Sequence, residues 1–157
     1  MNAQRTLAIE AADPGMPAVR ALIEELDALL HSLYPAESNH LLDIETLRQP
    51  DVRFLVTTLA GEPVGCGAFV ARDGYIEIKR MFVLPRCRGL KIGRALLAEL
   101  ERRAADEGFE FARLETGIHQ PEALGLYERG GYRYRAPFGD YLEDPLSVFM
   151  EKRLSVL

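Results

Sequence analysis

The sequence predicts an α/β fold of the α+β kind, in which a mixed, mostly antiparallel sheet of six to seven strands is flanked by about four helices. Two observations support this prediction. Three strand-like runs between residues 54 and 84 are joined by short glycine-containing turns, which is typical of an antiparallel meander. A helical pattern at 92–106 then separates the last of these runs from another at 109–116, which indicates a strand–helix–strand crossover.

The N-terminal part is expected to begin with a strand at 6–11, followed by a helix that ends at Tyr34-Pro35. Asp13, in the sequence Asp13-Pro-Gly, is expected to cap this helix. Its inward face carries apolar residues at helical spacing: Val19, Leu22, Ile23, Leu26, Leu30 and Leu33. A short helix is expected near 43–49. The strands of the meander are expected at 54–59, 64–72 and 75–84.

The C-terminal part alternates helices with strands. The spacing of Ile92, Leu96 and Leu100 predicts a helix over 92–106, which Gly108 stops. The elements expected after it are a strand at 109–116, a helix at 121–129, and strands at 132–135 and 146–152.

The composition limits the class of protein. The chain has 157 residues, 48% of them hydrophobic, which fits a single domain over residues 1–157. Its net charge of −5 disfavours nucleic acid and anionic membranes as partners, because both need a broad basic surface. We recognise no signal segment and no membrane-spanning run, and two cysteines are too few for a disulfide framework or a zinc site. We therefore expect a cytoplasmic protein without a metal. A homodimer is compatible with the sequence, which locates no interface.

Residues 83–97 form the most informative segment. There a strand passes through a turn containing Gly89 directly into a helix, so free backbone N–H groups and the positive end of the helix dipole converge. Cations also cluster in this segment: Arg86, Arg88, Lys91 and Arg94. A P-loop and a dinucleotide-binding fingerprint both fit poorly, because the glycines have the wrong spacing and number. The segment is predicted to bind an anion, with an ordinary basic loop that caps a helix as the alternative.

Two motifs resemble those of the GNAT acetyltransferases. The sequence Arg88-Gly-Leu-Lys-Ile-Gly93 is similar to their pyrophosphate-binding motif, Arg/Gln-x-x-Gly-x-Gly/Ala, with Lys91 where the middle glycine is usual. The sequence Ala123-Leu-Gly-Leu-Tyr-Glu-Arg-Gly-Gly-Tyr132 is similar to a second motif, Ala-x-x-x-Tyr-x-x-x-Gly-Phe/Tyr. The resemblance covers most of the chain. Its details from residue 115 onward are similar to a bacterial branch labelled indole-acetate acetyltransferases.

The resemblance implies a GNAT fold and acetyl-CoA as co-substrate. The residues that it implies for CoA binding are Met81, Phe82, Val83, Arg88, Gly89, Leu90, Lys91, Ile92, Gly93, Arg94, Gln120, Ala123 and Tyr127. If the backbone of Lys91 has a positive φ, a lysine there costs about 1 kcal/mol. Its ammonium would offset that cost by contacting a phosphate.

The resemblance also implies how the acetyl group reaches an amine. Tyr127 is expected to protonate the leaving thiolate, with simple packing as the alternative. Glu77 is expected to be the base, because strand alternation puts it inside the sheet on one face with Lys79 and Met81. Pairing with Lys79 or with an arginine of a neighbouring strand is the alternative for Glu77, and Glu115 is the reserve base. Backbone N–H groups near 81–83, splayed by a bulge, are implied to stabilise the thioester oxygen.

The acceptor is expected to be the amine of a small molecule, with a peptide amine as the second choice, and to react directly in a ternary complex. Substrate contacts are expected from Tyr34, His40, Glu115 and Tyr141. The charge of the acceptor stays open, since the acidic residues Asp140, Glu143 and Asp144 favour a cation and the basic residues Arg53, Arg80 and Arg135 favour a carboxylate. The alternative function is a CoA-binding module without catalysis.

Overall fold

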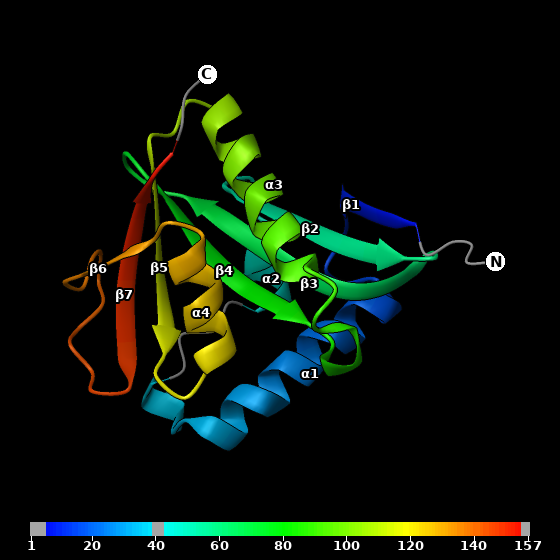
Figure 1. The fold of residues 1–157 in the computed structure, drawn as a ribbon, viewed down its shortest axis with the longest axis horizontal. Coiled ribbons are helices and arrows are strands. Elements are labelled where there is room, and N and C mark those ends of the chain that lie inside the picture. Colours follow the sequence, from blue (N-terminus) through cyan, green and yellow to red (C-terminus); the bar gives the residue numbers. More distant parts are fainter. Residues whose placement is uncertain (1–5, 39–42, 155–157) are drawn as a thin grey trace.

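Seven strands form one sheet in the order β1-β2-β3-β4-β5-β7-β6 in the computed structural model, which describes residues 6–38 and 43–154 (Figure 1). Neighbouring strands are antiparallel, except for the parallel pair β4 and β5. The strands are β1 (Leu7–Ala11), β2 (Val52–Leu59), β3 (Glu62–Ala71), β4 (Ile76–Val83), β5 (Phe111–Gly117), β6 (Arg133–Arg135) and β7 (Ser147–Arg153). The predicted mixed, mostly antiparallel sheet is confirmed.

Helices cover both faces of this sheet. They are α1 (Pro17–Leu33), α2 (Ile44–Leu47), α3 (Ile92–Asp106) and α4 (Pro121–Arg129), with short 3-10 turns at Ala36–Ser38 and Pro85–Cys87. In Figure 1, α1 crosses one face, whereas α3 crosses the other with α4 beside it. The bounds of α3 and α4 are those that the sequence predicts. Within the described ranges, no helix combines the length and the apolarity needed to cross a bilayer.

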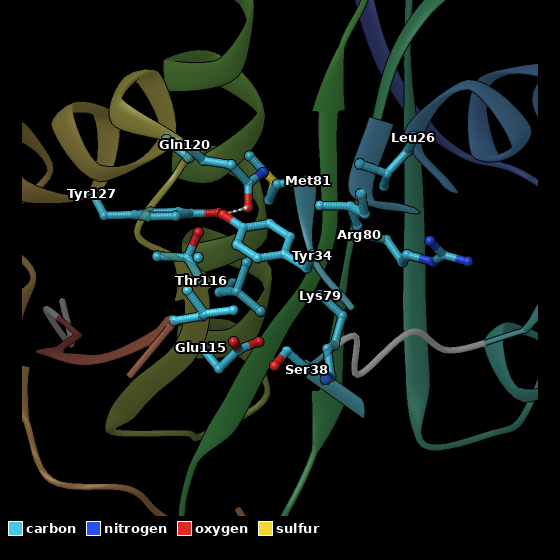
Figure 2. A pocket seen from close by; sticks show the side chains of 15 residues that line it. Leu26, Tyr34, Ser38, Lys79, Arg80, Met81, Glu115, Thr116, Gln120 and Tyr127 are labelled. Carbon is cyan, nitrogen blue, oxygen red and sulfur yellow. Dashed lines mark hydrogen bonds between the residues drawn. The ribbon is translucent and has the colours of Figure 1, made fainter. Parts of the chain in front are cut away.

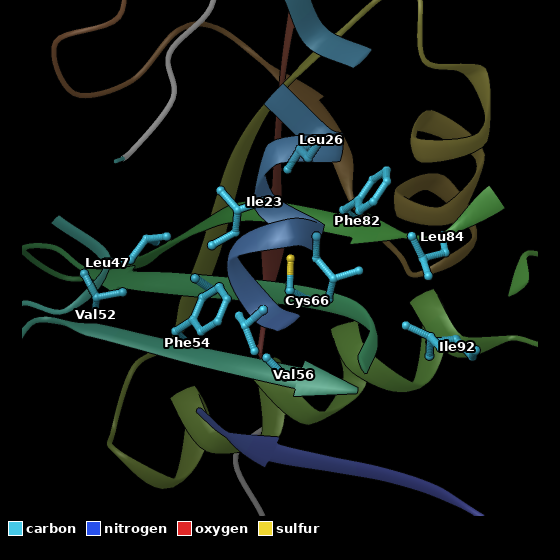
Figure 3. Packing of buried hydrophobic residues seen from close by; sticks show 14 of the residues in the cluster. Ile23, Leu26, Leu47, Val52, Phe54, Val56, Cys66, Phe82, Leu84 and Ile92 are labelled. Carbon is cyan, nitrogen blue, oxygen red and sulfur yellow. The ribbon is translucent and has the colours of Figure 1, made fainter. Parts of the chain in front are cut away.

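Alternate residues of the central strands pack into two separate cores. In β3, Ala68 and Val70 lie in the cluster beneath α1, whereas Phe69 lies in the cluster around α3. Figure 3 shows the first of these clusters, in which α1 residues such as Ile23 and Leu26 pack over the strands. Because both faces are buried, β3 is apolar along most of its length rather than alternating with polar residues.

The start of α1 differs from the prediction. Met16 is its N-cap, without a side-chain hydrogen bond, and Pro17 occupies the first helical position. Asp13 lies upstream, where its Oδ1 accepts hydrogen bonds from the Gly15 N–H and from Arg48 Nε, both at 2.9 Å. The expected Asp13 cap is therefore wrong, because the chain turns once more before the helix begins.

A β-bulge interrupts the pairing of β3 with β4. Ala68 pairs with Lys79 and Cys66 with Phe82, so Gly67 alone lies opposite Arg80 and Met81. Arg80 has a φ of 59° at this point. A Cβ atom on Gly67 would lie 2.5 Å from Met81 Sδ, so the glycine leaves the space that the bulged strand needs.

The bulge corrects one expectation about β4. Glu77 and Lys79 form an ion pair and share a face, but Met81 packs against the cluster around α3. Strand alternation therefore fails for Met81, because the extra residue reverses the direction of the side chains that follow it.

The parallel strands β4 and β5 pair only at their beginnings. Their register runs from Ile76 opposite Ala112 to Ile78 opposite Leu114, although the strands continue to Val83 and Gly117. Beyond these pairs the two strands diverge, as Figure 1 shows. The divergence opens the middle of the sheet next to the first turn of α3 and to α4.

Candidate active site

A groove of about 1110 Å³ runs between the later part of β4 and the helices α3 and α4. It is lined by all the residues predicted to bind CoA except Leu90: Met81, Phe82, Val83, Arg88, Gly89, Lys91, Ile92, Gly93, Arg94, Gln120, Ala123 and Tyr127. Leu90 is 49% exposed on the outside of the turn. Segments far apart in the sequence thus meet along one surface.

The first turn of α3 supplies hydrogen-bond donors to this groove. The earliest intrahelical bond runs from the Ala95 N–H to the Lys91 carbonyl, so the N–H groups of Ile92, Gly93 and Arg94 precede the helical ladder. Lys91, the N-cap, makes no capping hydrogen bond with its side chain. These donors, the helix dipole and the cations Arg88, Lys91 and Arg94 fit an anionic ligand of the diphosphate type.

Lys91 has the left-handed conformation that its position in the motif suggests, with φ 61° and ψ 23°. An L-residue pays about 1–2 kcal/mol for this conformation, and glycine avoids the cost. We therefore expect Lys91→Gly to raise the free energy of unfolding of the ligand-free protein by about 1 kcal/mol. Urea denaturation measures this change.

The matched control is Lys91→Ala, which removes the ammonium but keeps the left-handed backbone. The free energy of unfolding of Lys91→Ala should therefore not rise as that of Lys91→Gly does. Equal stability of the glycine and alanine variants would show that the backbone of Lys91 carries no strain.

A second, smaller cavity of about 90 Å³ lies between β4, β5 and the C-terminal half of α1 (Figure 2). Its lining includes polar groups from several elements: Tyr34, Ser38, Lys79, Arg80, Glu115, Thr116, Gln120 and Tyr127. Five residues line both this cavity and the groove: Leu26, Met81, Gln120, Ala123 and Tyr127. The two spaces are therefore neighbours that share part of their lining.

Tyr127 of α4 lies at the junction of the two spaces. Its side chain is 5% exposed, and its ring packs edge-on against Tyr132. Burial raises the pKa of Tyr127, and the negative charge of Glu115 raises it further. No hydrogen bond to its hydroxyl is found within residues 6–38 and 43–154. The phenol is thus held protonated, in a position to donate to a bound molecule.

Tyr34 joins the end of α1 to the loop between β5 and α4. Its hydroxyl donates to Gln120 Oε1 at 3.3 Å and accepts from the His119 N–H at 3.0 Å, and its ring stacks on His119. A Cβ atom on Gly117 would lie 1.8 Å from the Tyr34 hydroxyl oxygen. The absence of a side chain at Gly117 is therefore what allows Tyr34 to reach the cavity.

Glu115 of β5 contributes a carboxylate to the cavity wall. Its Oε2 accepts a hydrogen bond from Ser147 Oγ at 2.8 Å. Its charge contributes to the raised pKa of Tyr34, Tyr127 and Tyr141, so the carboxylate lies close enough to all three rings to influence them. Glu115, which the sequence analysis named as the reserve base, therefore lines the cavity.

Glu77 has a different setting. It is 3% exposed and does not line the cavity. One of its carboxylate oxygens contacts Arg72 Nη2 at 3.0 Å, and the other contacts Lys79 Nζ at 3.3 Å and the Tyr141 hydroxyl at 2.5 Å. Glu77 thus pairs with Lys79, as the alternative expected, and with an arginine that directly follows β3, whereas its role as the base stays a prediction.

Tyr141 also lies outside the lining of the cavity, behind Lys79 and Glu77. Burial raises the pKa of Tyr141, followed by the effect of the Glu77 charge, so its hydroxyl remains a donor to that carboxylate. His40, the remaining predicted substrate contact, lies outside the described residues.

Sequence reasoning missed Lys79 as a wall residue, although strand alternation already put it on the same face as Glu77. It also missed Gly117, whose importance depends on the distant Tyr34. In the part of the chain that the structure describes, no group of three or more His, Cys, Asp or Glu side chains is arranged to hold a metal ion.

Comparisons with known proteins agree with this arrangement. The profile of the family described as Acetyltransferase (GNAT) matches residues 19–132. An IAA acetyltransferase of Azospirillum brasilense is 53% identical over 143 residues, which cover 90% of this chain and 94% of that protein.

Solved structures share the fold. One from Klebsiella pneumoniae, described as an acyl-CoA N-acyltransferase, is 40% identical with a TM-score of 0.81, covering 96% of this chain and 99% of that one. An aminoglycoside 6′-N-acetyltransferase in complex with coenzyme A is 18% identical with a TM-score of 0.72, covering 93% and 96%.

Proposed function

Because the chain belongs to the GNAT family of acetyltransferases, we propose that it transfers an acetyl group from acetyl-CoA directly to the amine of a small molecule in a ternary complex. Members of this family use acetyl-CoA as the donor. One observation carries the proposal: the hydroxyl-bearing Tyr127 lies where the long groove meets the small polar cavity. The groove would hold the donor, and the cavity would hold the acceptor.

The donor would bind with its diphosphate at the first turn of α3. The N–H groups of Ile92, Gly93 and Arg94 supply hydrogen bonds there, and Arg88 and Lys91 supply positive charge. From that point the groove leads along Met81–Val83 of β4 to Tyr127. Backbone N–H groups of this part of β4, beyond the last pair with β5, are suited to stabilise the thioester oxygen as it becomes negative.

In the proposed reaction Glu115 acts as the base and Tyr127 as the acid. An alkylamine with a pKa of about 10.4 is mostly protonated at pH 7, so a carboxylate in the cavity both attracts the ammonium ion and accepts its proton, directly or through water. The amine nitrogen forms a bond to the thioester carbon while the carbon–sulfur bond breaks, and the nitrogen loses its second proton as the amide forms. The Tyr127 hydroxyl supplies a proton to the departing sulfur and regains one from the nitrogen through water, and Glu115 releases the proton that it accepted to the solvent.

The test uses CoA binding and thiol release with the same protein. Acetyl-CoA at 100 times its dissociation constant should stabilise the fold by about 2.7 kcal/mol, with a corresponding rise in melting temperature, whereas ATP and NAD should not. An amine panel should then release free CoA thiol at a rate above hydrolysis. Binding without thiol release from any amine would favour the alternative, a non-catalytic CoA-binding module, and no binding would reject both.

A further inference from the structure

We propose that Arg129 of α4 binds the 3′-phosphate of acetyl-CoA, so that the protein discriminates the complete donor from an analogue without this phosphate. The inference rests on the proposed function and adds a subsite for one end of the donor. It follows from the charges that line the groove and from the way in which α4 packs beside the first turn of α3.

The groove carries a net positive charge, although the whole chain has a charge of −5. Five cations line it: Arg88, Lys91, Arg94, Arg129 and Lys152. Two of them are paired, since Arg88 contacts Glu122 at 3.0 Å and Lys152 contacts Glu101 at 2.8 Å. Within the described ranges these two acids are the only carboxylates of the lining, so the groove keeps a charge of +3.

Three cations account for this charge: Lys91, Arg94 and Arg129. Within residues 6–38 and 43–154, none of their side chains forms an ion pair or a hydrogen bond. Glu128 is next to Arg129 in sequence but does not line the groove, and its Oε1 accepts a hydrogen bond from the Tyr134 hydroxyl at 2.8 Å. The three cations are therefore available to a ligand with several negative charges.

Contacts between α3 and α4 place Arg129 close to the anion-binding turn. A Cβ atom on Gly93 would lie 3.5 Å from Leu126 Cδ2, so the middle of α4 packs beside the first turn of α3 (Figure 1). A Cβ atom on Gly125 would lie 2.8 Å from Arg129 Nη1, so the guanidinium is folded back along α4 toward this middle. Arg129 thus supplies its charge from α4, whereas the other two cations belong to the start of α3.

The proposed donor has phosphates for both helices. Its diphosphate carries one negative charge on each phosphate and would bind at the start of α3, beside Lys91 and Arg94. Its 3′-phosphate is a monoester, which carries about −1.5 to −2 charges at pH 7. This group is attached to the ribose next to the diphosphate, on the side away from the thioester. A guanidinium binds such a group through paired N–H···O bonds, which suits Arg129.

The experiment measures the binding of CoA and of 3′-dephospho-CoA by calorimetry, which does not depend on turnover. The two ligands differ only in the 3′-phosphate. We expect the wild-type protein to bind CoA about tenfold or more tightly than dephospho-CoA. The preference should decrease as salt is added, because Arg129 is exposed to solvent.

Variants assign the preference to one residue. Arg129→Met should weaken the binding of CoA and reduce the preference to about twofold or less, with the affinity for dephospho-CoA nearly unchanged. Arg129→Lys should keep part of the preference, because it retains the charge but loses the planar fork. Arg133→Met and Arg86→Met are the controls, since both arginines are exposed and line neither space, and both variants should keep the preference. Melting temperatures show that each variant is folded.

The outcomes separate the inference from the function on which it rests. If the wild-type protein binds both ligands equally, or if Arg129→Met keeps the full preference, the inference is wrong and the acetyltransferase remains. An equal loss of affinity for both ligands in Arg129→Met, or a loss of the preference in either control, would also overturn it, because the effect would then not belong to the 3′-phosphate and Arg129. Failure of both ligands to bind would reject the proposed function itself.

Discussion

Tyr127→Phe is expected to lower kcat by about 10²–10⁴-fold, the usual contribution of a general acid. The change removes one oxygen atom and leaves the ring that packs against Tyr132. Because no described hydrogen bond depends on that hydroxyl, the fold and the binding of CoA should persist. Steady-state kinetics of thiol release measure the loss, and the shift in melting temperature with CoA checks binding.

The control for Tyr127 is Tyr134→Phe. Tyr134 lies on β6 and is 58% exposed, and its hydroxyl bonds to Glu128 outside both spaces. This variant should keep the wild-type kcat. If Tyr127→Phe also keeps the wild-type kcat, Tyr127 contributes only to packing, which is the alternative that the sequence left open.

Glu115→Gln is expected to lower kcat/KM for the amine by about 10²–10⁴-fold at pH 7, because glutamine keeps the shape but cannot accept the proton. The difference in kcat/KM between the wild type and Glu115→Gln should become smaller as the pH rises toward the pKa of the acceptor. The reason is that the neutral fraction of an alkylamine grows about tenfold per pH unit below about 10.4. A pH profile of both proteins tests this relation.

Glu77→Gln distinguishes the two candidate bases. Glu77 is ion-paired with Arg72 and Lys79, so its replacement should leave two cations without their anion and reduce stability, with a smaller loss of kcat than Glu115→Gln. A large loss of kcat in Glu77→Gln at unchanged melting temperature, together with a normal rate in Glu115→Gln, would return the base role to Glu77.

Much of the fold could be predicted because its signals are local. The helix α3 follows from apolar residues at helical spacing and a terminating Gly108, and α4 follows from Pro121 at its start and Gly130 after its end. The Asp13 cap failed because two later residues, Met16 and Pro17, set the start of α1. Local pattern alone does not choose between such neighbouring starts.

The candidate site also has parts that could be predicted and parts that could not. The anion-binding turn was predictable because its glycine, its cations and the helix that follows are contiguous in sequence. The sequence could not decide whether Glu77 or Glu115 is the base, since both are acids within strands. Only the divergence of β4 and β5 decides which of them faces a cavity. The bulge at Arg80 likewise depends on Gly67 of a neighbouring strand.

The short ladder between β4 and β5 also bears on biosynthesis. Everything from β1 to α3 leaves the ribosome before β5, and during that interval one edge of β4 has no partner. This strand carries Ile76, Ile78, Met81 and Phe82, and an apolar open edge invites pairing with another chain. Truncation after α3 would make that exposure permanent. Once it has been synthesised, β5 pairs with the first part of this edge, from Ile76 to Ile78, and so shortens the stretch of β4 that is open to another chain.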